Sequence, residues 1–173
     1  MKLFLLFLIV QNPINFWKEE IKIEIQNKTL KVRGIYYFKN LSNFYTSIIM
    51  RYPFPVDEYH EYPFHVKIKG FVFKREGNDL IMPVNFKPFE EKKIEVVYAQ
   101  RLKDKKAKYI LTTTQKWGKP LESAYFEIKV PLFFKDVKIS YKPDSVKIKK
   151  NFKFFYIHRK NFLPKDDIFI DWK

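Results

Sequence analysis

Apolar and polar residues alternate with a period of two along most of this chain. Ile21, Ile23 and Ile25 alternate with Lys22, Glu24 and Gln26, and residues 30–39 repeat the pattern with Gly34 interrupting one face. Successive side chains of a strand point to opposite faces, so this alternation is typical of a strand with one buried and one solvated side. Further strands are expected at residues 45–52, 64–74, 80–86, 93–101, 108–115, 123–130, 137–141, 145–149, 153–158 and 168–172.

These runs recur about every 8–12 residues, which is the rhythm of a β-sandwich or barrel. No helical stripe, no fixed-period repeat and no Gly- or Ser-rich linker divides the 173 residues. The chain contains no cysteine, so packing alone holds the core, for which 19 Phe, 11 Tyr and 3 Trp supply the material. The sequence therefore predicts an all-β fold, a single antiparallel β-sandwich of roughly ten strands.

The N-terminus has the pattern of an export signal. Met1 and Lys2 precede eight consecutive apolar residues, 3–10, and the polar residues 11–13 end the run. This arrangement matches a signal peptide. The run is shorter than the ~20 apolar residues of a membrane-spanning helix, and no other stretch of the sequence reaches that length. We expect a signal peptide at 1–16, a β-sandwich domain at 17–173 and a periplasmic or secreted location. A buried first strand and an uncleaved anchor are the alternatives, because no A-x-A-like cleavage site follows.

The formal charge of +15 comes mainly from lysine, since only five of the 34 basic residues are arginines. Such an excess favours anionic partners, although a compositional bias of the whole proteome would produce it as well. Lysines act as solvated point charges without the bidentate geometry of arginine. Another envelope protein or an anionic surface is the expected partner, and the scarcity of arginine argues against nucleic acid.

Several segments resemble a bacterial family of exported β-rich domains of unknown function. They are residues 32–40 (VRGIYYFKN), 52–57 (YPFPVD), 94–100 (IEVVYAQ), 109–113 (YILTT), 117–121 (WGKPL) and 161–168 (NFLPKDDI). The resemblance implies a signal peptide and an all-β domain. It implies no known activity, so it assigns no functional residue.

The densest group of metal-ligating residue types is His60, Glu61 and His65. Imidazoles and carboxylates are zinc ligands, but this spacing differs from the helical H-E-x-x-H of zinc peptidases. Pro53, Pro55 and Pro63 favour an extended loop instead. We therefore expect no metal and no cofactor.

The sequence offers no recognisable catalytic motif. No G-x-S-x-G or phosphate-binding glycine loop is present. Carboxylate pairs such as Glu19–Glu20 and Asp166–Asp167 would do acid–base chemistry only if the fold brought two acids together, and we expect them at solvated turns and strand ends. A carboxylate-dependent enzyme acting on envelope glycans is therefore the alternative, and a non-catalytic binding or structural module is the prediction.

Two features are candidates for binding. Trp117 lies beside Gly118 and is either an exposed contact residue or a cap on the core. Residues 146–156 interleave lysines with aromatic residues, which suits a sheet face that binds anionic lipid or single-stranded nucleic acid. The candidate lysines there are Lys147, Lys149, Lys150 and Lys153.

Overall fold

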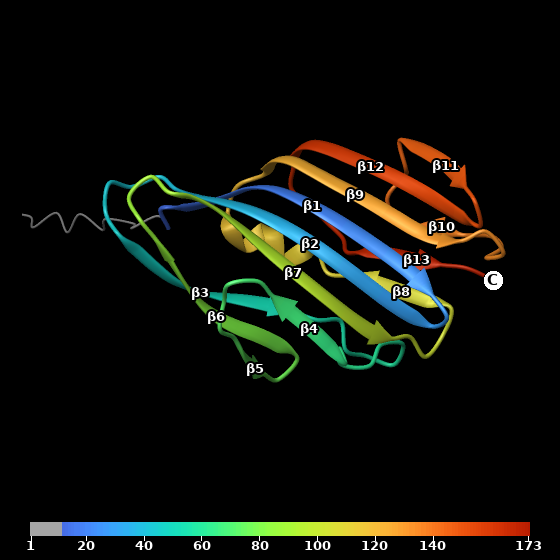
Figure 1. Cartoon of the computed structure of the whole chain (residues 1–173). Coiled ribbons are helices and arrows are strands. Elements are labelled where there is room, and N and C mark those ends of the chain that lie inside the picture. The colour runs from blue at the N-terminus through green and yellow to red at the C-terminus, as the bar shows by residue number, and fades with distance from the viewer. Residues whose placement is uncertain (1–11) are drawn as a thin grey trace, which may run out of the picture.

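The computed structural model describes residues 12–173, which confirm the all-β prediction. They form thirteen strands and one short 3₁₀-helix (Figure 1). These elements are β1 (Ile14–Gln26), β2 (Thr29–Asn40), β3 (Thr46–Pro53), β4 (His65–Ile68), β5 (Lys74–Glu76), β6 (Asp79–Phe86), β7 (Glu91–Arg101), β8 (Lys106–Tyr109), η1 (Thr112–Trp117), β9 (Leu121–Pro131), β10 (Lys138–Ile139), β11 (Ser145–Lys149), β12 (Phe152–Phe162) and β13 (Ile168–Asp171).

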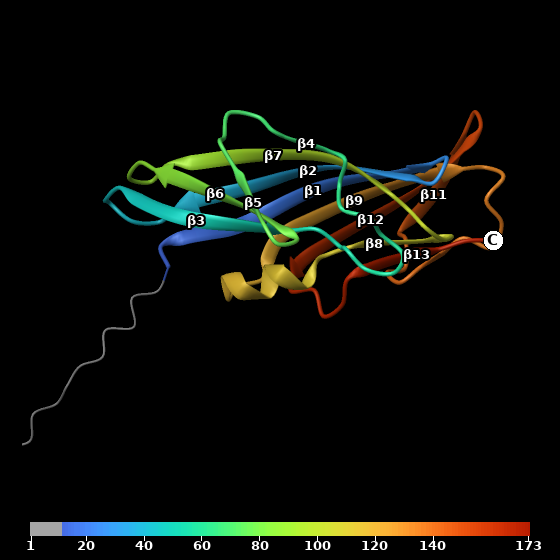
Figure 2. The same cartoon turned by 90° about the horizontal axis from the view of Figure 1, so that it is seen from below.

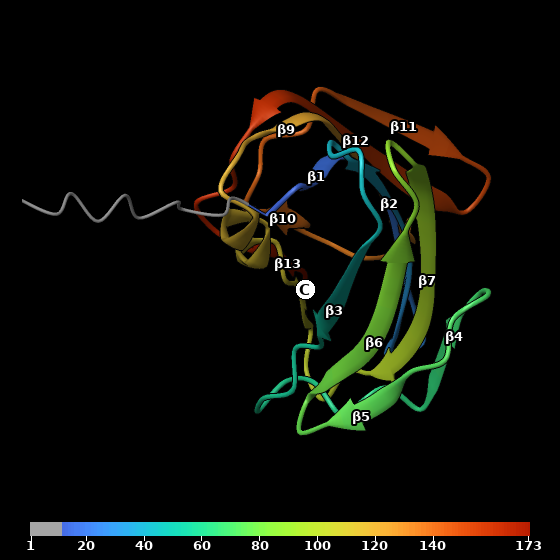
Figure 3. The ribbon, with the colours of Figure 1, turned by 90° about the vertical axis from the view of Figure 1, so that its left-hand side faces the viewer.

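The strands form one large and two small sheets. The seven-stranded sheet has the order β11-β12-β9-β1-β2-β7-β4, and the three-stranded sheets have the orders β10-β13-β8 and β3-β6-β5. The large sheet curves around the molecule, with β3, β13 and η1 on its inner side (Figure 3). Seen from below, β3, β8, β13 and η1 lie along one side of the large sheet (Figure 2). The core lies between these layers.

The large sheet is mixed, which differs from the antiparallel sandwich that the sequence predicts. β1 pairs antiparallel with β2 on one side and parallel with β9 on the other. Parallel strands need a long crossover, and here the chain passes through β2 to β8 and η1 before it enters β9. Ion pairs between the two strands on the outer face, Lys22–Glu127 and Lys129–Glu24, match this register.

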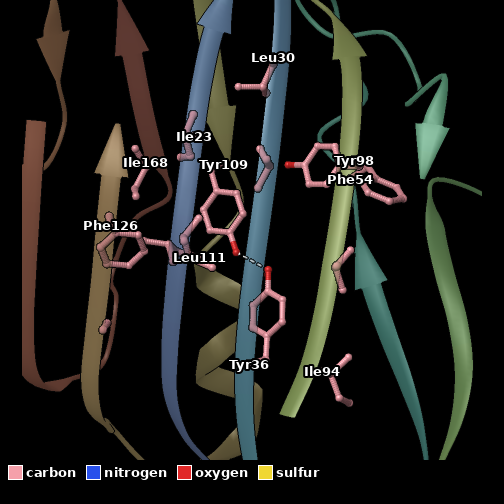
Figure 4. Close-up of a cluster of buried hydrophobic side chains, with 14 of the residues drawn as sticks. Ile23, Leu30, Tyr36, Phe54, Ile94, Tyr98, Tyr109, Leu111, Phe126 and Ile168 are labelled. Carbon is pink, nitrogen blue, oxygen red and sulfur yellow. Dashed lines mark hydrogen bonds between the residues drawn. The ribbon is translucent and has the colours of Figure 1, made fainter. Parts of the chain in front are cut away.

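The inner face of the large sheet is apolar, as the alternation predicts. Ile21, Ile23 and Ile25 are buried, and on β9 Phe126 and Ile128 stand beside Ile21 and Ile23. Figure 4 shows Ile23 and Phe126 within the cluster of buried side chains. Each fully buried side chain of this size contributes about 1.5–3 kcal/mol relative to an exposed one.

The first strand begins inside the segment that the sequence assigns to the signal peptide. Ile14 and Phe16 are buried, and the Phe16 ring stacks on Phe38 with 4.9 Å between centroids. The predicted boundary after residue 16 therefore cuts through β1, and the folded unit includes these residues. The apolar run of the predicted leader lies outside the described residues.

Helix η1 replaces the end of the strand that was expected at residues 108–115. One carboxylate oxygen of Asp167 accepts hydrogen bonds from the backbone N–H of Leu111 and of Thr112 and from the Thr112 hydroxyl, at 2.9, 3.0 and 2.9 Å. These donors lie where the helix starts, and an acceptor there satisfies groups that the helix itself leaves unpaired. The partner is 55 residues away along the chain, so local sequence could not indicate it.

Gly34 makes room for the ring of Tyr36 on the same strand. A Cβ atom at position 34 would lie 2.5 Å from Cζ and 2.7 Å from Cε2 of Tyr36. Such distances are far below van der Waals contact, so any side chain at position 34 would displace the Tyr36 ring. The glycine that interrupts the alternation therefore fixes the position of a tyrosine.

We predict that Gly34→Ala destabilises the protein by about 1–3 kcal/mol, the usual range for overpacking. The measurement is the free energy of unfolding from urea denaturation. Lys31→Ala, an exposed position on β2, is the control and should change little. In a Tyr36→Ala background the same Gly34→Ala change should cost nothing, because no ring remains to be displaced. An equal loss in both backgrounds would contradict this explanation.

Candidate functional site

The three residues of the possible metal site are not brought together. His60 is 2% exposed; its Nε2 accepts the backbone N–H of Lys108 at 2.9 Å, and its Nδ1 lies 2.6 Å from Asp57 Oδ1. Because Nε2 accepts, Nδ1 carries the proton and donates it, so both ring nitrogens are occupied. Glu61 and His65 are exposed. Within residues 12–173 no three His, Asp or Glu side chains are grouped closely enough to hold a metal ion.

Asp57 fixes His60 in place. Burial opposes the ionisation of Asp57, but hydrogen bonds from His60, Lys108 and the Tyr59 N–H outweigh it and lower the pKa of Asp57 to about 2. The pair of Asp57 and His60 thus ties the loop before β4 to β8. This role is structural.

Trp117 packs against the core. Its ring lies 5.9 Å from Phe16 in an edge-on arrangement and 5.2 Å from Phe38. Of the two alternatives drawn from the sequence, the core cap is the one observed. Trp117 also has a second environment, because it lines the cavity described below.

The candidate lysines lie at one edge of the large sheet but not all on one face. On the exposed edge strand β11, Lys147 and Lys149 lie 5.7 and 5.8 Å from the ring centres of Tyr156 and Phe154 on β12. Lys153 pairs with Ile148, so it points to the opposite face. Lys150 lies in the turn between the two strands and has φ 52°.

An interior cavity of about 80 Å³ lies between the large sheet, β3, β6, β8 and η1. Residues with polar side chains from β1, β2, β3, β7, β8 and η1 line it together with aromatic and apolar ones. The polar residues with groups on this lining are Glu19, Tyr36, Arg51, Tyr52, Tyr98, Tyr109, Thr113 and Thr114. Phe16, Phe38, Met50, Met82 and Trp117 are among the others. Of these residues, the sequence analysis names Trp117 as a binding candidate and Glu19 only as an acid expected at a solvated position.

Three tyrosine hydroxyls form a chain inside this cavity. Tyr36 Oη lies 2.8 Å from Tyr52 Oη and 2.7 Å from Tyr109 Oη. Figure 4 shows the hydroxyls of Tyr36 and Tyr109 pointing at each other from the two layers. Burial raises the pKa of all three phenols above the usual value, so the hydroxyls stay protonated. Two hydrogen bonds use two of the three protons, which leaves one O–H for another acceptor.

Glu19 places a carboxyl group in the same cavity. Its side chain is 1% exposed, and Oε1 has no hydrogen-bond partner among the described residues. Burial raises the pKa of Glu19 to about 8. A buried polar atom without a partner is uncommon in native proteins and calls for an explanation.

The sequence contains a signal for Glu19 that our interpretation overlooked. Position 19 has the same parity as Ile21, Ile23 and Ile25, so strict alternation places it on the buried face. The expectation that Glu19 and Glu20 are both solvated is therefore wrong for Glu19. Glu20 lies on the other face, where it pairs with Lys18 at 2.7 Å.

A groove of about 280 Å³ adjoins the cavity. Met50, Arg51, Pro53, Thr113 and Trp117 line both. Arg51 is exposed, and its guanidinium pairs with Glu76 and Asp79, each at 2.9 Å. The cavity and the groove therefore share part of their walls.

The cavity is suited to holding a small polar molecule. It presents one carboxyl group and three hydroxyls within an aromatic wall, the mixture of convergent polar groups and apolar lining found in ligand sites. Glu19 is the one carboxylate in this lining. The two-carboxylate arrangement of glycoside hydrolysis is therefore not formed there.

Comparison with solved structures identifies similar folds. A candidate nutrient-binding protein from Legionella pneumophila is similar with a TM-score of 0.66 and 15% identity, over 92% of this chain and 67% of that protein. An M1 zinc metallopeptidase from Deinococcus radiodurans is similar with a TM-score of 0.58 and 8% identity, over 93% of this chain and 42% of the peptidase. No family model and no curated protein sequence matches the chain.

These likenesses show the fold alone, because the identities are far below the level at which function transfers. The chain spans less than half the length of the peptidase. No helix within residues 12–173 has the length and apolar character needed to cross a membrane.

We predict that Glu19 makes the protein less stable as pH rises from about 4.5 to 8. The unfolded chain releases this proton near the ordinary pKa of 4.5, whereas the folded protein holds it up to about 8. Across that window the folded state binds one more proton, so the free energy of unfolding falls by about 1.4 kcal/mol per pH unit from this group. The contribution of Glu19 to the free energy of unfolding is fully present below its pKa in the unfolded chain and is lost by pH 8.

Glu19→Gln removes this titration. The difference in unfolding free energy between Glu19→Gln and wild type should therefore grow in favour of the variant from pH 5 to pH 8, measured by urea denaturation. Glu20→Gln is the matched control, because Glu20 lies on the outer face beside Lys18. Parallel curves for Glu19→Gln and wild type would show that Glu19 is ionised throughout.

Proposed function

We propose that this chain is an exported, non-catalytic binding module whose ligand is a small polar molecule held in the cavity around Glu19. The observation that carries the proposal is the Glu19 Oε1 atom, buried without a partner and lining a cavity with three tyrosine hydroxyls. Leaving such an atom unpaired costs about 1–3 kcal/mol or more for a charged group. A core that served stability alone would carry an apolar side chain at this position.

The size of the cavity limits the ligand. A water molecule needs about 10–15 Å³ of cavity volume measured in this way, so 80 Å³ has room for about five to eight waters. A ligand with a similar number of non-hydrogen atoms fits inside. A longer one would extend past Thr113 and Trp117 into the groove.

A non-catalytic role agrees with the chemistry of the lining. Hydrolysis of envelope glycans, the alternative from the sequence, needs two carboxyl groups about 5–9.5 Å apart, and the cavity lining has one. The likeness to a candidate nutrient-binding protein supports a binding module at the level of the fold. Export rests on the apolar run at residues 3–10, which lies outside the described residues.

A second partner, an anionic surface, is favoured by the lysines at the sheet edge. Lys147 and Lys149 extend from an edge strand whose residues are all exposed, and each stands near a ring of β12. Cations beside aromatic rings at an exposed edge suit lipid headgroups or acidic polymers of the envelope. This surface lies on the opposite face of the large sheet from the cavity.

We predict that Thr113→Phe abolishes small-molecule binding. Thr113 is partly buried and lines both cavity and groove, so a ring there blocks the junction. Saturation-transfer NMR with pooled alkylamines, amino acids, polyols and short carboxylates should detect at least one compound bound to wild type and none bound to Thr113→Phe. Lys31→Phe, on the exposed face of β2, is the control and should bind as wild type does. Binding that survives in Thr113→Phe, or no binding to wild type, would contradict the proposal.

We predict that replacing Lys147 and Lys149 together by Gln weakens binding to vesicles containing anionic lipid by roughly 30-fold, since each lysine near such a surface contributes about 1 kcal/mol. Lys67 and Lys69, exposed at the opposite edge of the same sheet, provide a matched double substitution that should have a smaller effect. Vesicle sedimentation at low and high salt measures the binding of both double variants. Binding that is insensitive to salt, or equally weakened by the two pairs, would argue against this surface.

A further inference from the structure

The charge on Glu19 has no counterpart inside the cavity. Arg51 is the one basic residue in the lining, and its guanidinium is exposed and paired with Glu76 and Asp79. Buried charges in proteins are paired or neutralised, because an isolated one is strongly disfavoured. A cation bound beside the carboxylate would neutralise it.

The wall around Glu19 is unusually aromatic. Phe16, Tyr36, Phe38, Tyr98, Tyr109 and Trp117 all line the cavity. Aromatic ring faces attract cations, and several rings beside one carboxylate are the usual surroundings of an organic ammonium group. An anionic or purely apolar ligand would gain less from this wall.

The hydroxyl oxygens add hydrogen-bond acceptors. Each tyrosine oxygen of the chain Tyr52–Tyr36–Tyr109 can accept as well as donate, and two bonds among three hydroxyls leave acceptor positions free. A primary ammonium has three N–H donors. Glu19 and the tyrosine oxygens together provide acceptors for them.

We propose that the cavity binds the ammonium group of a small organic amine, with Glu19 as its counter-ion and the aromatic wall around its alkyl part. This inference rests on the proposed binding function and names the class of ligand. The volume fits an amine of about five to eight non-hydrogen atoms. The remainder of a larger amine would extend into the adjoining groove.

The proposal implies a characteristic pH dependence. Burial raises the pKa of Glu19 to about 8, so below that pH an incoming ammonium must displace a proton from the carboxyl. The other titratable groups facing Glu19 are Tyr36, Tyr52 and Tyr109, which stay protonated, whereas Arg51 is exposed and paired with Glu76 and Asp79. Affinity for the amine should therefore rise about tenfold per pH unit up to about pH 8 and then level off.

The test compares three probes of matched size: n-butylammonium, 1-butanol and butyrate. We expect calorimetric titration of the wild-type protein at pH 6, 7, 8 and 9 to detect binding of butylammonium alone, tightening about fiftyfold from pH 6 to pH 8. Glu19→Gln should weaken butylammonium binding at pH 8 at least tenfold, whereas Glu20→Gln on the outer face should leave it unchanged. Proton release on binding, measured in buffers of different ionisation enthalpy, tests the same point without any variant.

The outcomes separate the two proposals. Binding of 1-butanol or butyrate that is lost in Thr113→Phe would overturn the amine inference and leave the cavity as the site. Butylammonium binding that does not vary with pH and survives Glu19→Gln would also overturn it. If none of the three probes binds, the amine inference is overturned too. If no compound of the wider panel binds, the binding function itself is overturned.

Discussion

A single hydroxyl group joins the three sheets of this protein. Tyr36 belongs to the large sheet, Tyr52 to the sheet of β3 and Tyr109 to the sheet of β8, and the Tyr36 oxygen bonds to both partners. The two small sheets share no strand with the large one, so side-chain contacts contribute to setting their positions. Tyr36 reaches its partners because Gly34 leaves space for its ring. One glycine thus makes room for the hydroxyl group that contacts both small sheets.

The same arrangement explains why a carboxyl group persists in the core. Glu19 lies among polar hydroxyls and beside open volume, where either a proton, water or a ligand can satisfy it. In a close-packed apolar core, by contrast, the carboxyl group would have no such partner and would destabilise the fold. Functional sites are where proteins commonly retain residues that the rest of the core does not favour. The cavity and the unpaired acid are therefore best considered together.

Local pattern was sufficient for the fold class and for much of the core. Ile21, Ile23 and Ile25 are buried because alternation is a local property of a strand. Contacts between distant segments were beyond the reach of this reasoning: the parallel pairing of β1 with β9 and the support of η1 by Asp167 each depend on residues far apart in sequence. The predicted boundary after residue 16 falls within β1, because a short apolar run just before a strand does not show where a leader ends.

The candidate site was missed for a different reason. The two-residue alternation places Glu19 on the buried face of its strand. However, two adjacent acids after a lysine are ordinarily solvated, and this general expectation was given more weight than the alternation. Tyr52 and Tyr109 converge on Tyr36 only through the packing of the layers, so no spacing in the sequence could indicate them. Trp117 was identified, but as a surface or core residue, because a cavity beside it has no signature in the sequence.

The strongly basic character of the chain does not conflict with a cationic ligand in its interior. On the outer face of β1, Lys18 and Lys22 pair with Glu20 and Glu127, and Glu24 pairs with Lys129. Surface lysines are further screened within about 8–10 Å by salt. Burial is the cause of the raised Glu19 pKa, which is set by the cavity and not by the net charge. Alternation along β1 thus separates two electrostatic environments, an outer face of paired charges and an interior that holds the carboxyl group of Glu19.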